Sequence, residues 1–311
     1  MKKFLLTFLI VFGFAVCAQA YPDQPITMIV PYNAGGSLDS TTRIITEFMK
    51  QELDKPIMIN NRPGASGTIG LDAFLKTKAD GYTVLVFPTS SFVTPVFQGR
   101  EAIDTNQFKP VGGFLKSERI LFARPDAPYK TFDELISYAR ENPGKLKFGS
   151  GGSTDTAYVF KYIIKEEKLD VNVTLFNGGA PAAAAIMGGH VDLVEGGNGS
   201  PADVAAMAGK LVPLCILSDG NLAKYPELKT PLQMGYEYAS SVMFGFFLHA
   251  DAPDEAQQTL SNVLKKVLEK KELQEKFASR GVEPKYFSGA ELIKSAEAGA
   301  KVAQLYELLG E

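Results

Sequence analysis

The stretch that decides the fold is Ile26-Thr-Met-Ile-Val30 followed by Pro31-Tyr-Asn-Ala-Gly-Gly-Ser-Leu-Asp39. Residues 26–30 are apolar at alternate and adjacent positions, which is typical of a strand buried on both faces. The two glycines that follow permit a tight turn and close approach of the backbone to a ligand. Beyond the turn, apolar residues recur at spacings of three and four as far as Leu53, which predicts a helix.

This strand, glycine loop and helix arrangement recurs along the chain. Further strands are predicted at 82–87, 146–148, 171–176 and 191–194. Alternation of strands and helices predicts an α/β fold with a mostly parallel sheet. Ligands of such sheets bind beyond the carboxyl ends of the strands. The glycine-rich loops that follow these ends are therefore expected to converge on a cleft, and they span residues 32–39, 149–156, 177–181 and 195–200.

These four loops suit an anion. The unpaired N–H groups at a helix start attract negative charge, and each helix dipole contributes about 0.3–1 kcal/mol. The loops contain neither Lys nor Arg. We therefore expect backbone N–H groups, hydroxyls and amides from several loops to hold the anion together.

Composition excludes several classes of protein. The chain has 311 residues, of which 45% are hydrophobic and 22% charged, as in folded globular proteins with one or two domains. The formal net charge of -3 gives no basic balance that would point to nucleic acid. Beyond the first residues, no apolar run approaches the roughly 18 residues that a membrane-spanning helix needs.

The first 20 residues have the pattern of a secretory signal. Lys2 and Lys3 precede a short apolar stretch, and Ala18-Gln-Ala20 offers the small residues at a signal-peptidase site. We expect cleavage before Tyr21 and a periplasmic protein. The alternative is a lipoprotein anchored at Cys17, although bulky Val16 precedes it. The remaining Cys215 lies in an apolar run and is expected to be buried.

No cofactor or metal site is predicted. His190 and His249 are the only histidines, and neither has a second ligand at metal-binding spacing. No G-x-S-x-G elbow or phosphate-binding loop occurs. One enzyme class remains as an alternative, an exported hydrolase that would use Ser66 or Ser153 with one of the histidines.

An ordered set of motifs carries a family resemblance. The chain resembles the extracytoplasmic substrate-binding receptors of tripartite tricarboxylate transporters, also called Bug receptors. The motifs cover nearly the whole chain after the signal. They are residues 31–39 quoted above, Asn61-Arg-Pro-Gly-Ala-Ser-Gly-Thr-Ile-Gly70, Asp80-Gly-Tyr-Thr83, Pro143-Gly-Lys-Leu-Lys-Phe-Gly-Ser150, Gly178-Gly-Ala-Pro-Ala182, Gly188-Gly-His-Val-Asp-Leu193 and Ala208-Gly-Lys-Leu211.

The resemblance implies a two-lobed type II periplasmic binding-protein fold with a ligand cleft between the lobes. Residues 21–123 and 241–311 would form lobe 1, and residues 124–240 would form lobe 2. The chain would cross first near residues 120–123 and return near residues 240–247.

The resemblance also implies a function. A monomeric, non-enzymatic protein would capture a small carboxylate and deliver it to membrane transporter subunits, with no cofactor and no nucleic acid. A variant role would report the ligand to a sensor kinase. Asp39 would either contact the ligand or cap its own helix. The ligand-binding residues implied by matching positions are Tyr32, Ala34, Gly35, Gly36, Ser37, Asp39, Thr89, Ser90, Ser150, Ser153, Thr154, Gly179, Ala180 and Asn198.

Overall fold

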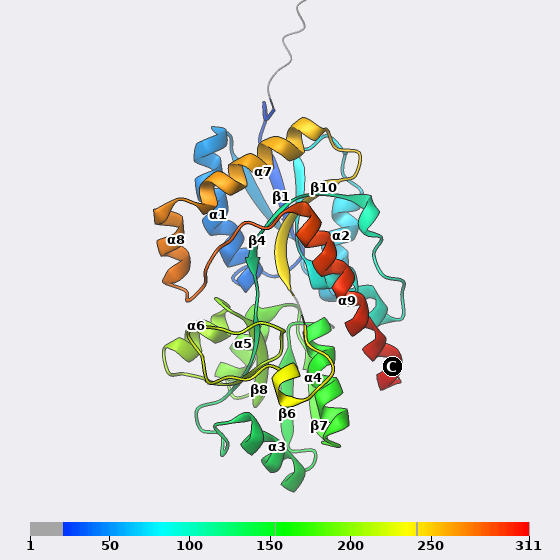
Figure 1. Ribbon diagram of the computed structural model, residues 1–311, viewed down its shortest axis with the longest axis vertical. Coiled ribbons are helices and arrows are strands. Elements are labelled where there is room, and N and C mark those ends of the chain that lie inside the picture. The colour runs from blue at the N-terminus through cyan, green and yellow to red at the C-terminus, as the bar shows by residue number, and fades with distance from the viewer. Residues whose placement is uncertain (1–20, 153, 241, 311) are drawn as a thin grey trace, which may run out of the picture.

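The molecule consists of two α/β lobes stacked along its long axis (Figure 1). The computed structural model describes residues 21–152, 154–240 and 242–310. The predicted signal peptide, residues 1–20, and Ser153 lie outside these described residues. We call the part built on the sheet that contains β1 the first lobe, and the part built on the other sheet the second lobe.

The first lobe contains a five-stranded sheet in the order β2-β1-β3-β10-β4. Strand β1 pairs in parallel with β2 and β3, whereas β10 runs antiparallel to both β3 and β4. One strand is therefore reversed in an otherwise parallel sheet. The strands are β1 (Ile26–Val30), β2 (Ile57–Asn61), β3 (Thr83–Pro88), β4 (Phe108–Lys116) and β10 (Met243–His249).

The second sheet repeats this plan in the order β7-β6-β8-β5-β9. Strand β6 is parallel to β7 and β8, and β5 is antiparallel to β8 and β9. The prediction of mostly parallel strands is confirmed in both lobes. The strands are β5 (Arg119–Ala123), β6 (Leu146–Ser150), β7 (Val171–Leu175), β8 (Leu193–Gly197) and β9 (Val212–Ile216).

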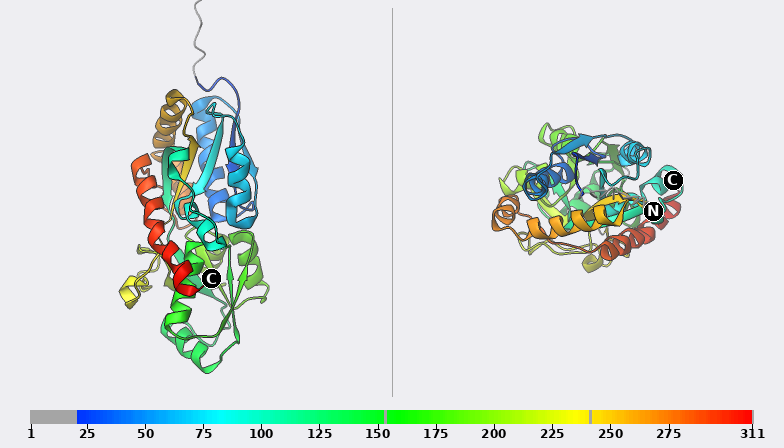
Figure 2. Two further views of the ribbon diagram at one scale, coloured as in Figure 1. Left: turned by 90° about the vertical axis from the view of Figure 1, so that its right-hand side faces the viewer. Right: turned by 90° about the horizontal axis from the view of Figure 1, so that it is seen from above.

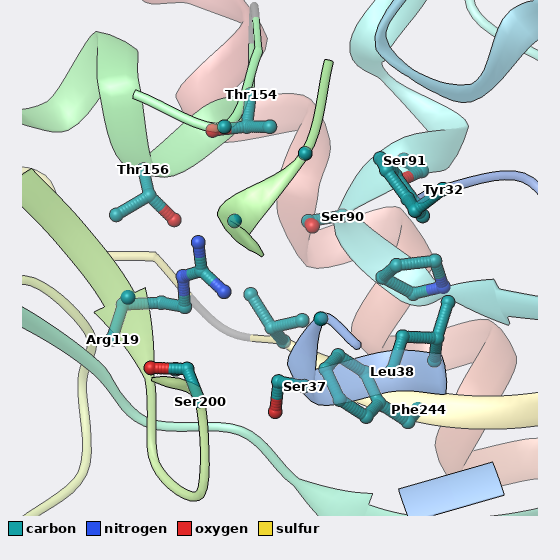
Figure 3. Close-up of a pocket in the computed structure, with 18 of the residues that line it drawn as sticks. Tyr32, Ser37, Leu38, Ser90, Ser91, Arg119, Thr154, Thr156, Ser200 and Phe244 are labelled. Atoms are coloured by element: carbon teal, nitrogen blue, oxygen red, sulfur yellow. The ribbon is translucent and has the colours of Figure 1, made fainter. Parts of the chain in front are cut away.

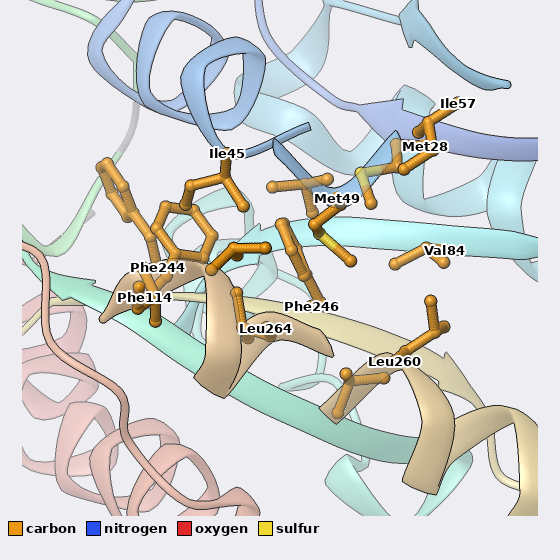
Figure 4. Packing of buried hydrophobic residues seen from close by; sticks show 14 of the residues in the cluster. Met28, Ile45, Met49, Ile57, Val84, Phe114, Phe244, Phe246, Leu260 and Leu264 are labelled. Atoms are coloured by element: carbon orange, nitrogen blue, oxygen red, sulfur yellow. The ribbon is translucent and has the colours of Figure 1, made fainter. Parts of the chain in front are cut away.

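Helices cover both faces of the first sheet, which explains its nearly continuous apolar strands. Met28 and Ile29 point to opposite faces because side chains alternate along a strand, and they join different core clusters. Figure 4 shows Met28 and Phe246 packing with Ile45 and Leu264 of the covering helices. One face carries α1 (Ser37–Leu53), α7 (Asp254–Leu268) and α8 (Lys271–Ala278), and the other carries α2 (Thr68–Leu75) and α9 (Gly289–Leu309).

The second lobe is layered in the same way. Leu121 and Leu193 pack on one face of its sheet, and Phe122 and Val194 pack on the other. Cys215 of β9 is buried in the first of these clusters, as the sequence predicted. Helices α3 (Phe132–Glu141) and α4 (Asp155–Glu166) cover the first face, and α5 (Gly179–Met187) and α6 (Pro201–Met207) cover the second.

Helix α9 contacts both lobes. Its first turns pack on the first sheet through Leu292 and Ala296, whereas Val302 and Leu305 belong to the core cluster of the second lobe. The left view of Figure 2 shows α9 running down the side of the molecule from one lobe to the other. The expected assignment of all residues 241–311 to lobe 1 therefore does not hold for the last turns of α9.

The chain passes between the lobes earlier than expected. Strand β4 ends at Lys116 in the first sheet, and β5 begins at Arg119 in the second. The crossing thus lies at Ser117–Glu118 rather than at residues 120–123. Both strands are apolar, so the sequence pattern alone did not distinguish the last strand of one lobe from the first of the other. None of the helices in the described residues is long and apolar enough to cross a membrane.

Candidate ligand-binding cleft between the lobes

A cavity of about 70 Å³ lies where the carboxyl ends of the parallel strands of the two lobes face each other (Figure 3). Loops after β1 and β3 approach it from the first lobe, and loops after β6, β7 and β8 approach it from the second. The lining residues are Tyr32, Gly36, Ser37, Leu38, Asp39, Pro88, Ser90, Ser91, Arg119, Gly151, Thr154, Asp155, Thr156, Gly178, Gly179, Gly196, Gly197, Ser200, Val242 and Phe244.

The loop after β1 brings an uncapped helix start to this cavity. Gly35 has φ +84°, a left-handed conformation that favours glycine, and it turns the chain toward α1. Gly36 is the N-cap of α1 and supplies no side-chain cap to the first N–H groups of the helix. Those groups have no partner within the helix, so they are available to an anion.

Asp39 organises this loop. Its Oδ2 accepts hydrogen bonds from the Gly35 N–H (2.8 Å) and from Arg43 Nε (2.9 Å), and its Oδ1 accepts one from Asn61 Nδ2 (2.9 Å). Burial alone would raise the pKa of Asp39, but these hydrogen bonds together hold the pKa below its ordinary value. Of the two roles expected for Asp39, these contacts favour local support of the loop and helix start over contact with a ligand.

A second uncapped helix start faces the cavity from the other lobe. The N-cap of α5 is Gly178, with φ +119° and no side-chain cap, and Gly179 begins the helix. By contrast, α4 and α6 are capped by their own side chains, because Thr154 Oγ1 accepts from the Ala157 N–H (3.3 Å) and Ser200 Oγ accepts from the Asp203 N–H (3.2 Å). Of these four helices around the cavity, α1 and α5 are the pair with unsatisfied N-termini.

The lobes touch each other around the cavity. Ser37 Oγ donates to the carbonyl of Asn198 across the cleft (3.2 Å). At the periphery, Lys224 Nζ donates to the carbonyl of Gly281 (3.0 Å), and Arg280 Nη2 donates to that of Gly199 (3.1 Å). These contacts from opposite lobes hold the cleft in a closed arrangement.

Three ionisable side chains line or border the cavity. Arg119 extends from β5 and pairs with the buried Glu195 of β8. Asp155 begins α4 and accepts a hydrogen bond from Ser240 Oγ (2.6 Å), while burial raises its pKa above the ordinary value. The hydroxyl of Tyr32 lies 2.8 Å from Ser91 Oγ, and burial raises the pKa of Tyr32 to about 12.

The structure brings together half of the ligand-binding residues expected from the sequence. The residues that line the cavity are Tyr32, Gly36, Ser37, Asp39, Ser90, Thr154 and Gly179. Those that lie nearby without lining it are Ala34, Gly35, Thr89, Ser150, Ala180 and Asn198.

The side chains of two of these residues have other partners. Thr89 is buried against α9, because its hydroxyl lies 2.7 Å from Ser295 Oγ and accepts from the Met243 N–H (2.9 Å). Ser150 Oγ donates to the carboxylate of Glu195 (3.0 Å), so Ser150 supports a charged side chain and lies behind the cavity surface.

Sequence reasoning missed Arg119. The expected site had no basic side chain, because the four glycine loops contain none. Arg119 comes instead from the strand that follows the crossing between the lobes. The available signal was an arginine directly before the apolar run Ile120–Ala123. Ser91, Thr156, Ser200 and Phe244 were missed as well, although they lie in or beside predicted loops.

The two histidines lie away from the cavity. His249 is at the far end of β10 from Phe244, and its Nε2 lies 3.0 Å from the Phe74 carbonyl and 3.2 Å from Thr77 Oγ1. His190 is exposed and precedes β8, whereas the cavity is reached at the other end of that strand. Within the described residues, no group of three His, Cys, Asp or Glu side chains could hold a metal ion.

The chain matches a family of known proteins. A family model described as "Tripartite tricarboxylate transporter family receptor" matches residues 41–308. Among curated relatives, Protein BugT of Bordetella pertussis is 28% identical over 285 residues, which is 86% of this chain and 84% of BugT.

Solved structures share the fold. Periplasmic binding protein BugD superposes with a TM-score of 0.82 at 23% identity, covering 93% of this chain and 99% of BugD. Rpa4515 of R. palustris with adipate gives 0.83 at 22% identity, covering 92% and 98%. MatC of Rhodopseudomonas palustris with bound malate gives 0.79 at 22% identity, covering 94% and 100%. The expected two-lobed periplasmic binding-protein fold is confirmed.

Proposed function

The chain belongs to the tripartite tricarboxylate transporter receptor family, and from that premise we propose that it captures a small carboxylate in the cleft and delivers it to membrane transporter subunits. It acts as a periplasmic binding protein after removal of residues 1–20. It carries the ligand unchanged and does not turn it over. The variant in which the same ligand signal reaches a sensor kinase would use the same cleft.

The observation that carries this proposal is the pair of uncapped helix N-termini. Helix α1 follows Gly36 in the first lobe and α5 follows Gly178 in the second, and both begin at one cavity. A carboxylate placed between them would accept hydrogen bonds from N–H groups of both lobes. Binding would then favour the closed arrangement, because a ligand shifts the equilibrium toward the state that it contacts better.

The binding of carboxylates by structural neighbours supports the ligand class. Rpa4515 is described with adipate and MatC with malate. The proposed hydrolase alternative lacks this support, since neither His190 nor His249 lies at the cavity. A nucleophilic serine needs a base within hydrogen-bond reach.

Calorimetric titration with a panel of small mono- and dicarboxylates tests the proposal. We expect saturable binding of at least one member at one molecule per chain. Parallel incubation with a simple ester should give no turnover. Absence of binding across the panel, or turnover of the ester at the cleft, would contradict the proposed function.

A further inference from the structure

Arg119 occupies a position that the fold prepares in detail. It starts β5 and lies opposite Gly197 of β8, so Glu195, two residues away on the same strand, faces the same side of the sheet. A Cβ at Gly197 would lie 3.1 Å from Arg119 Nη1 and 2.5 Å from Ser117 Oγ. The glycine therefore leaves the space that the guanidinium occupies, and Figure 3 shows Arg119 extending among the cavity-lining residues.

Glu195 holds the guanidinium in place. Its side chain is 0% exposed, and one carboxylate oxygen accepts from Arg119 Nη2. The other oxygen accepts from Ser150 Oγ (3.0 Å) and the Gly151 N–H (3.3 Å). These hydrogen bonds stabilise the buried carboxylate as an anion, so it fixes the orientation of the Arg119 side chain.

The same end of the cavity contains polar atoms without partners. Arg119 Nε is buried and has no acceptor among the described residues, although the side chain as a whole remains 16% exposed. Ser117 Oγ and Asn198 Oδ1, beside Gly197, are also buried without a partner in the described part of the chain. A buried donor without a partner is costly, most of all when it is charged. An acceptor supplied by a ligand would remove this cost.

We propose that Arg119 binds a second carboxylate of the ligand, so that the substrate class is a dicarboxylate held between Arg119 and the N-termini of α1 and α5. This inference rests on the proposed function, which supplies the first carboxylate. Glu195 is a positioning residue, because it acts by orienting Arg119.

The charges around the cavity agree with this assignment. Arg119 and Glu195 cancel each other, so discrimination comes from the fixed hydrogen-bonding edge of the guanidinium, which matches a carboxylate. Asp155 would repel a dianion when ionised. Burial raises the pKa of Asp155, which favours its neutral form beside an anionic ligand.

The experiment compares dicarboxylates with isosteric monoamides. Succinate, glutarate and adipate are titrated by calorimetry beside succinamate, glutaramate and adipamate. The parent protein should bind at least one dicarboxylate tighter than its monoamide by on the order of tenfold or more, which one charge-assisted contact supplies.

The central variant is the double substitution Arg119→Gln with Glu195→Gln. It removes both charges together, so no unpaired buried charge remains to unfold the protein. The dicarboxylate should lose on the order of tenfold in affinity, and the monoamide should bind nearly as before. Arg119→Lys is the second variant, since it keeps Glu195 paired while removing the planar fork, and it should weaken the same preference.

Arg124→Gln is the matched control. It removes a positive charge from the same lobe, but Arg124 does not line this cavity and pairs with Asp126 at the surface. The control should keep the parent preference. A parent protein that binds both members of each pair equally, or a double variant that keeps the preference, would overturn the assignment while leaving the proposed function intact. Failure of every carboxylate and monoamide to bind would overturn both.

Discussion

Replacement of Gly36 by alanine separates binding from folding. Gly36 has φ −69° and ψ 170°, a conformation that any L residue adopts. A Cβ at this position would meet only the Asn33 carbonyl oxygen, at 3.5 Å, which is ordinary van der Waals contact. Since Gly36 lines the cavity, the added methyl would take space where the ligand must approach the start of α1.

The expected magnitude follows from one hydrogen bond. A bond between a charged carboxylate and a helix N–H contributes about 1.5–3 kcal/mol. Its loss would weaken binding by roughly 10- to 150-fold. The free energy of unfolding should stay unchanged or rise by up to about 1 kcal/mol, because alanine restricts the unfolded chain more than glycine does.

Two companion variants sharpen the assay, which is calorimetric titration combined with thermal unfolding. Gly179→Ala adds a methyl at the start of α5 with no other heavy atom within 4 Å, so it should weaken binding from the other lobe. Gly35→Ala also meets no atom within 4 Å but has φ +84°, so it should lower stability by about 1–2 kcal/mol. If Gly36→Ala and Gly179→Ala both bind like the parent, the helix N-termini do not hold the carboxylate.

Three further results are expected. The pKa of Asp39 is lower in the folded chain than in the unfolded one, so its contribution to stability is present above the unfolded pKa and is lost as pH falls through the folded pKa; Asp39→Asn should therefore flatten the acid side of a stability–pH profile, and an unchanged profile would contradict the role given to this carboxylate. Chelator treatment should leave ligand affinity intact, and a loss that a divalent ion restores would refute metal-independent binding. N-terminal sequencing of exported protein should begin at Tyr21, whereas a lipid-modified Cys17 would support the lipoprotein alternative.

Much of the fold follows from local patterns in the sequence. Strand β1 was predicted with its observed bounds, since an apolar run followed by a glycine turn has few other interpretations. Ser200 and Pro201 were expected as cap and first-turn residues, and Ser200 does accept from the Asp203 N–H at the start of α6. Such features depend on neighbours within one helical turn, so the sequence contains them fully.

The rest of the site depends on contacts between distant residues. Arg119 reaches the cavity only because β5 pairs with β8 across 76 positions, which no local pattern indicates. Thr89 follows a strand end as predicted, yet α9 offers its hydroxyl a partner in Ser295, 206 positions away. The sequence thus predicts which loops form the cleft, but the orientation of individual side chains depends on the packing of α9 and on strand pairing.

The central claim is that the cleft holds one small carboxylate between the lobes. Native mass spectrometry of the parent protein purified without denaturation, beside the double variant Gly36→Ala with Gly179→Ala, tests it most directly. The parent should carry one small carboxylic acid per chain, and the folded double variant should carry none. A parent protein whose bound molecule lacks a carboxylate, or a double variant that retains the same ligand at equal occupancy, would contradict the account.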